Sequence, residues 1–396
     1  GFASFTYEQC LFEFVIANEP RFDHDPVTRE CKGLLIEESR INQWLYSEDI
    51  VTYITGGNLQ QSTLENTTAT TDLTGETNAV KMAATAAGGA HSIYKNFTSG
   101  SNGDVHTFSV WVKAAGADYA RIYVDTVGGN LGGPGVTFST KNTWNVSATG
   151  VATQTASSVV EYPNGWWRLS VTGSFSNRND YYFHIDLEGG EGDVGFVGNS
   201  SDGIYVWGAQ VEAGKFATSY IPTTGTTMTR GNESFEIDGE DFTDFFNATE
   251  GTVLSHITPL NGSLGNHSGT GGVVWSFDAG SSFGNGNYLS NANSTTAFGH
   301  SVVVGSSGQN TGGGTGNLTN GVPFKNATIF KKDDFIMATN GTLASADTSG
   351  NLPTVVKLML GNNGWGNALN AANIHFNRFA YYPKRLPNTQ MVTLTS

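Results

Sequence analysis

Short apolar runs separated by Gly, Asn and Ser recur along the whole chain, and this spacing constrains the fold more than any other feature. Glycine alone accounts for 51 of the 396 residues. A chain interrupted this often does not sustain long helices, whereas short strands joined by turns require such residues. The sequence therefore predicts an all-β protein. Its length exceeds what one ordinary core holds, so we expect two domains.

The predicted strands fall into two series on either side of a Thr- and Gly-rich linker, TTGTTMTRGN (223–232). Strands of this length and spacing are typical of antiparallel sandwiches. We expect two antiparallel β-sandwich domains in tandem, at 33–226 and 227–396. The first series is 106–114, 119–126, 135–140, 143–148, 157–162, 166–175, 181–188 and 204–212, and the second is 252–260, 273–279, 301–305, 326–331, 334–339, 355–361 and 373–382.

Residues 1–32 are expected to form an attachment segment rather than part of either domain. Pro20 and Pro26 interrupt regular structure. The segment carries Phe2, Phe5 and other aromatic residues but is too short to bury them alone. We therefore expect it to pack on a neighbouring subunit. Cys10 and Cys31 are the two cysteines of the chain, and free thiols are favoured over a disulfide because no dense disulfide framework exists.

The charge and motif content excludes several classes of function. The net charge of −15 disfavours nucleic acid and anionic membranes as partners. No run approaches the roughly 20 apolar residues that span a bilayer. The chain contains no HExxH and no Cys/His ligand cluster, and no catalytic residue, metal or cofactor is predicted. A pair of glycosidase carboxylates is left open, because acidic residues are numerous.

Two segments predict short helices. EIDGEDFTD (236–244) is acidic enough to suggest Ca²⁺ binding, but its spacing differs from an EF-hand loop, and a helix start or solvated turn is favoured. PNTQMVTLT (387–395) begins with Pro387, as helices commonly do, and predicts a closing helix.

The alternation of side chains along the first series defines a candidate binding face. One parity of each strand is apolar, and the other mixes aromatic rings with hydrogen-bonding groups. We expect this second set to share one sheet surface, with Tyr205 and Trp207 near its edge. Sugar recognition requires such a mixture. A face buried against another subunit and a plain solvated surface are the alternatives. The candidate residues are Trp111, Tyr123, Trp166, Arg168, His184, Asp186 and Trp207.

Several stretches resemble a module of tailed-phage head-fibre and tail-fibre virion proteins. They are RFDHDPVTRECKGLLIEESRINQWLYSED (21–49), NGWWRLSVTGSF (164–175) and GIYVWGAQVEAGKFATSYIPT (203–223). The module is similar to carbohydrate-binding jelly rolls. The segments DTSGNLPTVVKLMLG (347–361) and HFNRFAYYPKRLPNTQMVTLT (375–395) resemble the concanavalin-like, laminin-G-like sandwich that often follows it. The resemblance implies a jelly roll over 33–226 and a laminin-G-like sandwich over 227–396.

The resemblance also implies a setting and partners. It points to a bacteriophage fibre or capsid decoration protein on the virion surface, with weak glycan adhesion during host attachment and no enzymatic activity. A homo-oligomer is expected, with a trimer as the usual form, and residues 1–32 would contact other virion proteins. A secreted bacterial glycan-binding module or adhesin is the alternative. A depolymerase with its catalytic unit elsewhere in a longer chain is a third.

Overall fold

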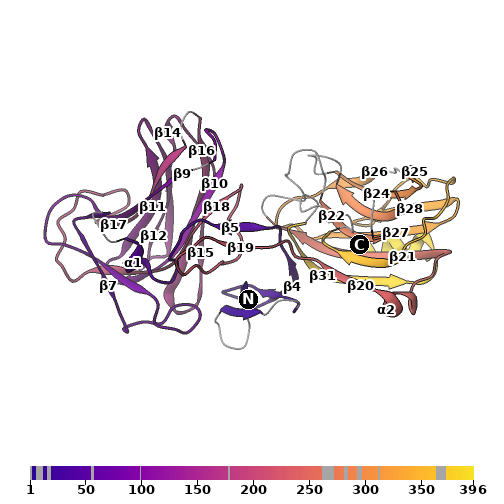
Figure 1. Ribbon diagram of the computed structural model, residues 1–396, viewed down its shortest axis with the longest axis horizontal. Helices are drawn as coiled ribbons and strands as arrows, with labels where there is room; N and C mark the ends of the chain where they lie inside the picture. Colours follow the sequence, from indigo (N-terminus) through magenta and orange to yellow (C-terminus); the bar gives the residue numbers. More distant parts are fainter. Residues whose placement is uncertain are drawn as a thin grey trace. The chain divides into compact units, whose positions relative to one another are not determined.

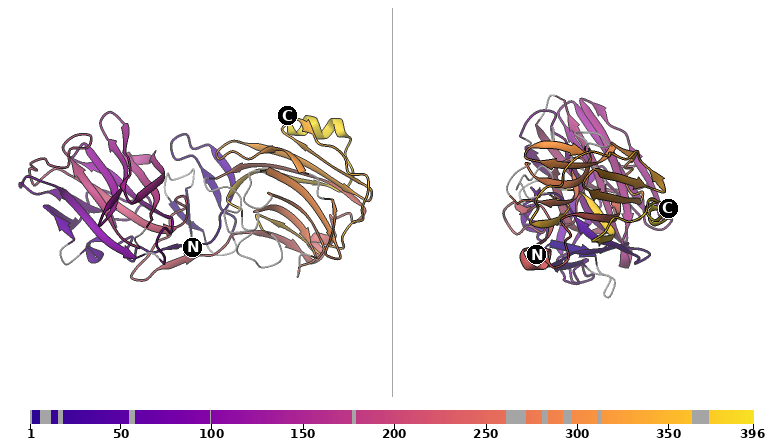
Figure 2. Two further views of the ribbon diagram at one scale, coloured as in Figure 1. Left: turned by 90° about the horizontal axis from the view of Figure 1, so that it is seen from above. Right: turned by 90° about the vertical axis from the view of Figure 1, so that its right-hand side faces the viewer.

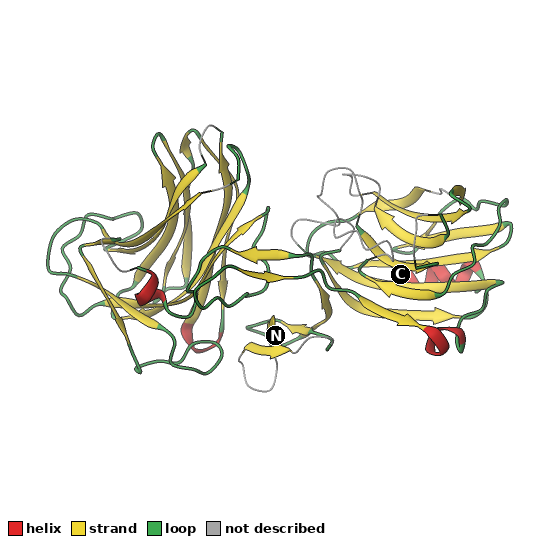
Figure 3. Ribbon diagram, viewed as in Figure 1, coloured by secondary structure: helices red, strands yellow, loops and turns green. Residues whose placement is uncertain are grey.

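The computed structural model describes residues 2–5, 12–15, 19–54, 58–98, 100–176, 179–260, 272–280, 284–291, 297–310, 313–362 and 372–396. Strands dominate throughout (Figure 3). Within these residues the α-helices are short and few: α1 Ile50–Tyr53, α2 Gly239–Thr243 and α3 Asn388–Thr395. The prediction of an all-β fold with antiparallel sheets is confirmed.

The chain divides into two compact units, each of which has its own core. The first contains residues 1–17, 24–30 and 40–230, and the second contains residues 18–23, 31–39 and 231–396. The chain thus supplies residues 18–23 and 31–39 to the second unit before residues 40–230 form the main body of the first, and it then returns to complete the second (Figure 1).

The first unit is a sandwich of two antiparallel sheets. Its six-stranded sheet has the order β15 (Ala152–Glu161), β16 (Trp166–Phe175), β10 (His106–Ala115), β18 (Gly203–Ala213), β8 (Val80–Ala84) and β7 (Ser62–Asn66). Its seven-stranded sheet has the order β13 (Asn142–Val146), β12 (Gly129–Thr137), β11 (Tyr119–Thr126), β17 (Asp180–Glu188), β9 (His91–Thr98) and β6 (Leu59–Gln60), and β14 (Thr149–Gly150) also pairs with β12.

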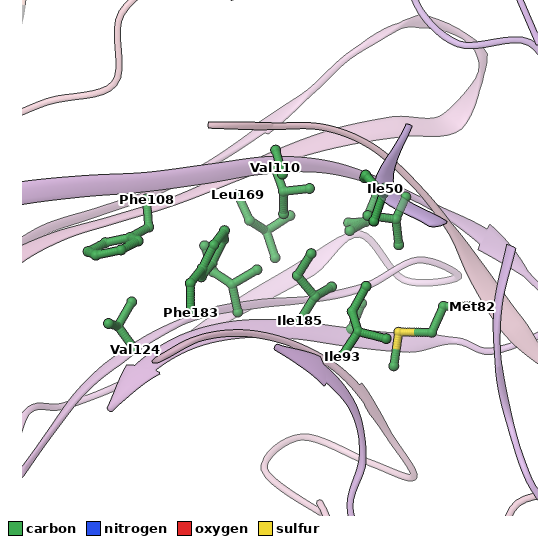
Figure 4. Close-up of a cluster of buried hydrophobic side chains, with 14 of the residues drawn as sticks. Ile50, Met82, Ile93, Phe108, Val110, Val124, Leu169, Phe183 and Ile185 are labelled. Atoms are coloured by element: carbon green, nitrogen blue, oxygen red, sulfur yellow. The ribbon is translucent and has the colours of Figure 1, made fainter. Parts of the chain in front are cut away.

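Alternating apolar residues from both sheets fill the space between them. Phe108 and Val110 of β10 face Val124 of β11 and Phe183 and Ile185 of β17, and all five are fully buried (Figure 4). Because successive side chains of a strand point to opposite faces, this apolar set leaves the other parity of each strand on the outside of the sandwich.

The second unit is also a two-sheet sandwich. One seven-stranded sheet contains β20 (Phe235–Asp238), β30 (Lys357–Leu360), β22 (Val273–Asp278), β23 (Gly286–Asn291), β24 (Ala297–Val304) and β25 (Ser307–Asn310), and β26 (Gly313–Asn317) pairs with β24. The other contains β29 (Thr342–Leu343), β28 (Asp334–Thr339), β27 (Phe324–Lys331), β21 (Glu250–Pro259), β31 (Ile374–Tyr382), β4 (Cys31–Ile36) and β3 (Phe22–His24).

Helix α3 covers the outer face of the second of these sheets. Figure 2 shows α3 at the C-terminus lying along the strands of the second unit. Its Met391 is fully buried among Leu254, Ile329 and other residues of β21, β27 and β28. The closing helix predicted from Pro387 is therefore present, and Pro387 occupies its N-cap.

The expected attachment segment is not separate from the sandwiches. β4 pairs with β31, placing Ile36 opposite Ile374, and the Ile36 side chain is buried in the core of the second unit. A domain boundary at residue 33 is therefore corrected, because residues 31–39 belong to the second unit. Buried charge also fixes this segment: Arg21 lies 2.7 Å from Glu37 and 2.5 Å from Glu233. The sequence pattern did not reveal this pairing because its partner strand lies more than 300 residues further along the chain.

Four smaller features complete the description. β1 (Phe2–Phe5) pairs with β2 (Phe12–Val15), and β5 (Arg40–Asn42) pairs with β19 (Met228–Arg230). The acidic segment 236–244 forms the end of β20 and then α2. Cys31 is exposed with a free thiol, and Cys10 lies outside the described residues.

Candidate functional site

The seven predicted site residues lie on two different sheets. Trp111, Trp166, Arg168 and Trp207 belong to the six-stranded sheet, whereas Tyr123, His184 and Asp186 belong to the seven-stranded sheet. In each strand the neighbouring residues of opposite parity fill the shared core, so both groups face outward on opposite sides of the sandwich. The expectation that they share one surface is wrong, because parity fixes a side of a strand but not the sheet to which that strand belongs.

The three tryptophans are buried in a second apolar cluster. Trp111, Trp166 and Trp207 pack with Leu73, Ala79 and Tyr220 and are fully inaccessible. The ring centroids of Trp111 and Trp207 are 5.4 Å apart, and the indole nitrogen of Trp166 donates to the Thr71 carbonyl. Residues 70–79 and 218–223 cover the face, so no indole plane is available to a ligand.

Arg168 is part of the same covered face. Its guanidinium carbon lies 4.3 Å from the centroid of the Trp111 ring, and Nη2 donates to the Thr218 carbonyl at 2.8 Å. The cation therefore fixes the covering segment to the tryptophan beneath it. The side chain therefore contributes to the packing of the sandwich.

A bulge in β18 interrupts the regular alternation of side chains along that strand. Tyr205 and Trp207 face outward, but Ala209 and Val211 lie in the main core. The register between β10 and β18 shifts between Ser109 and Trp111, opposite Gly208, whose φ is +67°. An extra residue at a bulge reverses the alternation, so the four residues do not share a face, although unbroken alternation along 204–212 would place them together.

The outer face of the seven-stranded sheet carries a row of stacked rings. Tyr123 of β11, His184 of β17 and Tyr94 of β9 are directly opposite one another across three strands. The His184 ring lies 4.2 Å from Tyr123 and 5.0 Å from Tyr94, nearly parallel to both. Adjacent strands therefore hold these three rings in one orientation.

A charged row lies next to the aromatic one. Arg121 places Nη2 at 3.2 Å from the Asp186 carboxylate and Nε at 3.0 Å from Glu188, and its guanidinium carbon is 5.0 Å from the Tyr123 ring centroid. His184 Nε2 lies 3.2 Å from Asp125 Oδ1. One arginine thus bridges two buried carboxylates beneath the tyrosines.

Burial changes the protonation of these carboxyl groups. It raises the pKa of Glu188 to about 7, with a further contribution from the charge of Asp186 and opposition from Arg121. Burial likewise raises the pKa of Asp186, although Ser92 and Arg121 counteract it, and burial raises the pKa of the Tyr123 hydroxyl. Glu188 therefore changes its charge near neutral pH.

The site has an inner and an outer layer. His184, Asp186 and Glu188 are each no more than 5% exposed. The half-buried side chains above and around them are Tyr94, Tyr119, Tyr123, Asp125, Trp144 and Tyr182. We call this second group the tyrosine face. Its phenol and indole groups combine an apolar body with a polar tip, which suits a ligand rich in hydroxyl groups.

Sequence reasoning missed part of the tyrosine face. Tyr94 lies on β9, which was not among the predicted strands. Trp144 lies on a predicted strand, and its ring crosses β12 at Gly135, where an added Cβ would stand 2.3 Å from the indole. Parity along 119–126 and 181–188 already placed Tyr119 and Tyr182 beside the chosen residues.

Outside the tyrosine face, we considered metal sites, pockets and membrane-spanning helices. No group of three or more His, Cys, Asp or Glu residues in the described part of the chain could hold a metal ion. A pocket of about 460 Å³ lies between the end of β31 and α3 in the second unit, lined by Tyr382, Lys384, Leu386, Thr389, Gln390, Thr393 and Leu394. Among the described residues no helix has the length and hydropathy required to cross a membrane.

Comparisons with known proteins give weak likenesses only. No protein-family profile matches the chain, and no curated protein matches it. Among solved structures, the heptameric SAP-like pentraxin of Limulus polyphemus is 12% identical over 38% of this chain and 70% of its own, with a TM-score of 0.31. The NanB sialidase of Streptococcus pneumoniae is 11% identical, with a TM-score of 0.35, over 41% of this chain and 27% of its own. Domains LG4-5 of the mouse laminin α1 chain are 9% identical over 73% of this chain and 86% of theirs, with a TM-score of 0.27. All three scores are low, and the fold class of this chain is established by its own sheets.

Proposed function

We propose that the first sandwich is a carbohydrate-binding adhesion module and that the tyrosine face is its binding surface. The observation that carries this proposal is the two-layer arrangement on the seven-stranded sheet, with half-buried tyrosines above a buried charged layer. A saccharide offers C–H surfaces and hydroxyl groups together, and tyrosine side chains complement both.

The inner layer supports binding by fixing the outer one. Tyr123 is held between His184 on one strand and the guanidinium of Arg121 on its own strand. Side chains whose orientation is fixed before binding lose less conformational entropy when a ligand arrives. His184, Asp186 and Arg121 therefore act as positioning residues.

The charge of the protein favours an uncharged glycan. The chain carries a net charge of −15, and the tyrosine face adds Asp125 at its rim. An anionic sugar would be repelled. The stacked rings of Tyr94, His184 and Tyr123 cover one another, so hydrogen bonds from their edges would contribute more than stacking on an open ring. Such a site is weak alone and gains from multiple copies.

We propose a virion as the setting for these copies. The support is the resemblance of residues 21–49, 164–175 and 203–223 to tailed-phage fibre modules. In that setting the protein is a non-enzymatic fibre or decoration protein on the virion surface, assembled as a homo-oligomer and attached to other virion proteins. Mass spectrometry of purified particles tests this directly. A chain found in the culture medium of uninfected bacteria and absent from particles would instead favour a secreted bacterial adhesin.

Removal of the tyrosine hydroxyls tests the binding proposal. A variant with Tyr94→Phe, Tyr123→Phe and Tyr182→Phe retains the rings and should lose about ten-fold or more in affinity for glycans that the unmodified protein captures on an array, since each lost hydrogen bond contributes about 1 kcal/mol. Tyr205→Phe, a half-buried tyrosine on the other sheet, is the matched control. Equal binding by both variants would refute the tyrosine face as the site.

A further inference from the structure

Strand β15 leaves one side of the six-stranded sheet unpaired. Its hydrogen-bonded neighbour is β16, in the register Ala156–Thr172 through Glu161–Trp167, and in the described part of the chain no strand pairs with its other side. Residues 156, 157, 158 and 160 are exposed. The outward backbone N–H and C=O groups of this strand are therefore available to another strand.

β15 is unlike the other edge strands of the two sandwiches. It has ten residues, whereas the other edges in the described structure have five or fewer: β7, β13, β6, β20, β25, β29 and β3. Short edges present too few backbone groups to pair stably, which is one way in which proteins avoid unwanted association. β15 lacks that protection.

The sequence of β15 also lacks the usual protective residues. ATQTASSVVE contains no Lys, Arg or Pro, and Val160 is 39% exposed. Its one charge, Glu161, is paired with Lys141 at 2.6 Å. A bulge between Gln154 and Ala156 bends the first part of the strand, but the register with β16 is unbroken from Ala156 to Glu161. This second part can accept a further strand.

Strand β13 does not occupy this edge. Side-chain contacts join the two strands near the ends of β15, where the Gln154 amide bonds to Asn145 and the Glu161 carboxylate to Lys141. Between these contacts, no hydrogen bond in the described part of the chain connects β13 to β15, and the side chains from Ala156 to Val160 are small and uncharged.

We propose that β15 is an association edge for a second copy of this chain, with the two strands antiparallel and centred on Ser158. A two-fold axis places the same strand of both copies side by side and antiparallel, so each strand presents the backbone groups that the other requires. In this register Ala156 of one copy faces Val160 of the other, and the two Glu161 side chains lie at opposite ends of the paired segment, so like charges are not opposed. The six-stranded sheets of the two copies then form one continuous sheet.

A lysine at the centre of the edge tests this proposal. The 42.1 kDa chain should sediment as a dimer at micromolar concentration, under reducing conditions that keep Cys31 from cross-linking. Ser158→Lys opposes two cations across the axis and should weaken dimerisation by about ten-fold or more. Thr153→Lys, exposed on the same strand but before the bulge, is the matched control and should remain dimeric.

A mixture of two variants distinguishes the loss of a specific strand pairing from misfolding. Ser158→Lys mixed with Ser158→Glu should restore the dimer, since opposite charges then face each other. A monomeric unmodified protein, a dimer that persists in Ser158→Lys, or a mixture that stays monomeric would each overturn the proposal. A trimer, the form implied by the resemblance to phage fibres, would also overturn the two-fold pairing.

Discussion

Trp111 and Tyr123 have equivalent positions in the alternating sequence pattern, but Trp111 is fully buried and Tyr123 is half-buried. Each is an aromatic residue on the outward side of a strand whose inward-facing residues are apolar. Trp111 is buried in a cluster with Leu73, Ala79 and Tyr220, whereas Tyr123 remains half-buried at the surface. At the scale of a single residue, the covering segment decides whether an aromatic side chain stabilises the fold or meets a ligand.

Replacement of Trp111 should therefore affect stability. Trp111→Ala removes a fully buried indole and should lower the free energy of unfolding of the first sandwich by about 3–5 kcal/mol. Trp144→Ala, at a half-buried indole of the tyrosine face, should cost clearly less. Urea unfolding followed by fluorescence compares the two variants. Equal losses would contradict the burial of Trp111.

The raised pKa of Glu188 predicts that this residue lowers the free energy of unfolding as the pH rises. Most carboxylates, whose pKa is lowered by folding, have the opposite effect. The folded protein holds this proton up to a pH of about 7, whereas the ordinary pKa of a glutamate side chain is 4.5. The unfolded chain therefore loses the proton first, and the stabilisation from Glu188, fully present below about pH 4.5, is lost as the pH rises to 7.

Glu188→Gln isolates this contribution. The variant should show a smaller fall in the free energy of unfolding of the first sandwich between pH 5 and pH 7.5 than the unmodified protein does. Glu65→Gln on β7 is the control, because Glu65 is exposed. If the change in the free energy of unfolding with pH were unaffected by Glu188→Gln but altered by Glu65→Gln, the pH dependence could not be assigned to Glu188.

At the scale of an element, β18 shows how one glycine sets the direction of a whole strand. Before Gly208 its outward residues are Tyr205 and Trp207, and after Gly208 its inward residues are Ala209 and Val211. The strand thus contributes to two apolar clusters in succession. A regular strand with the same sequence would place Val211 on the side of Trp207.

Gly208→Ala should disturb this arrangement in two ways. Its φ of +67° is strained for alanine, and the new Cβ would stand 2.8 Å from Trp111. Gly103→Ala shares a positive φ of +83° but has no atom within 4 Å of its added Cβ. We expect Gly208→Ala to lower the midpoint of thermal unfolding further than Gly103→Ala does. Equal shifts would show that the contact with Trp111 contributes nothing.

At the scale of the whole molecule, the first sandwich interrupts the second in the chain. Residues 31–39 supply a strand to the second unit before residues 40–230 form most of the first. Gly33 is required in this strand, because a Cβ there would stand 2.1 Å from the Phe376 carbonyl oxygen. The second sandwich therefore depends on residues at both ends of the chain.

Two isoleucines five residues apart should report on different units. Ile36→Ala creates a cavity in the core of the second unit and should destabilise that unit by about 2–5 kcal/mol. Ile41→Ala is 45% exposed on β5 of the first unit and should change stability by less than about 0.5 kcal/mol. Hydrogen exchange by mass spectrometry resolves the effect, and Ile36→Ala should release protection in β31. Loss of protection confined to β10 and β11 would contradict the assignment of β4.

The sequence by itself determined the fold class, most of the longer strands and the closing helix, because alternation and turn residues act over a few neighbouring positions. It also placed Tyr123, His184 and Asp186 on the outward side of their strands. Only the tertiary structure decided which strands share a sheet, that segments 70–79 and 218–223 bury Trp111, Trp166 and Trp207, and that β4 belongs with β31. These outcomes depend on contacts between residues far apart in the chain, whose free energy no local pattern records.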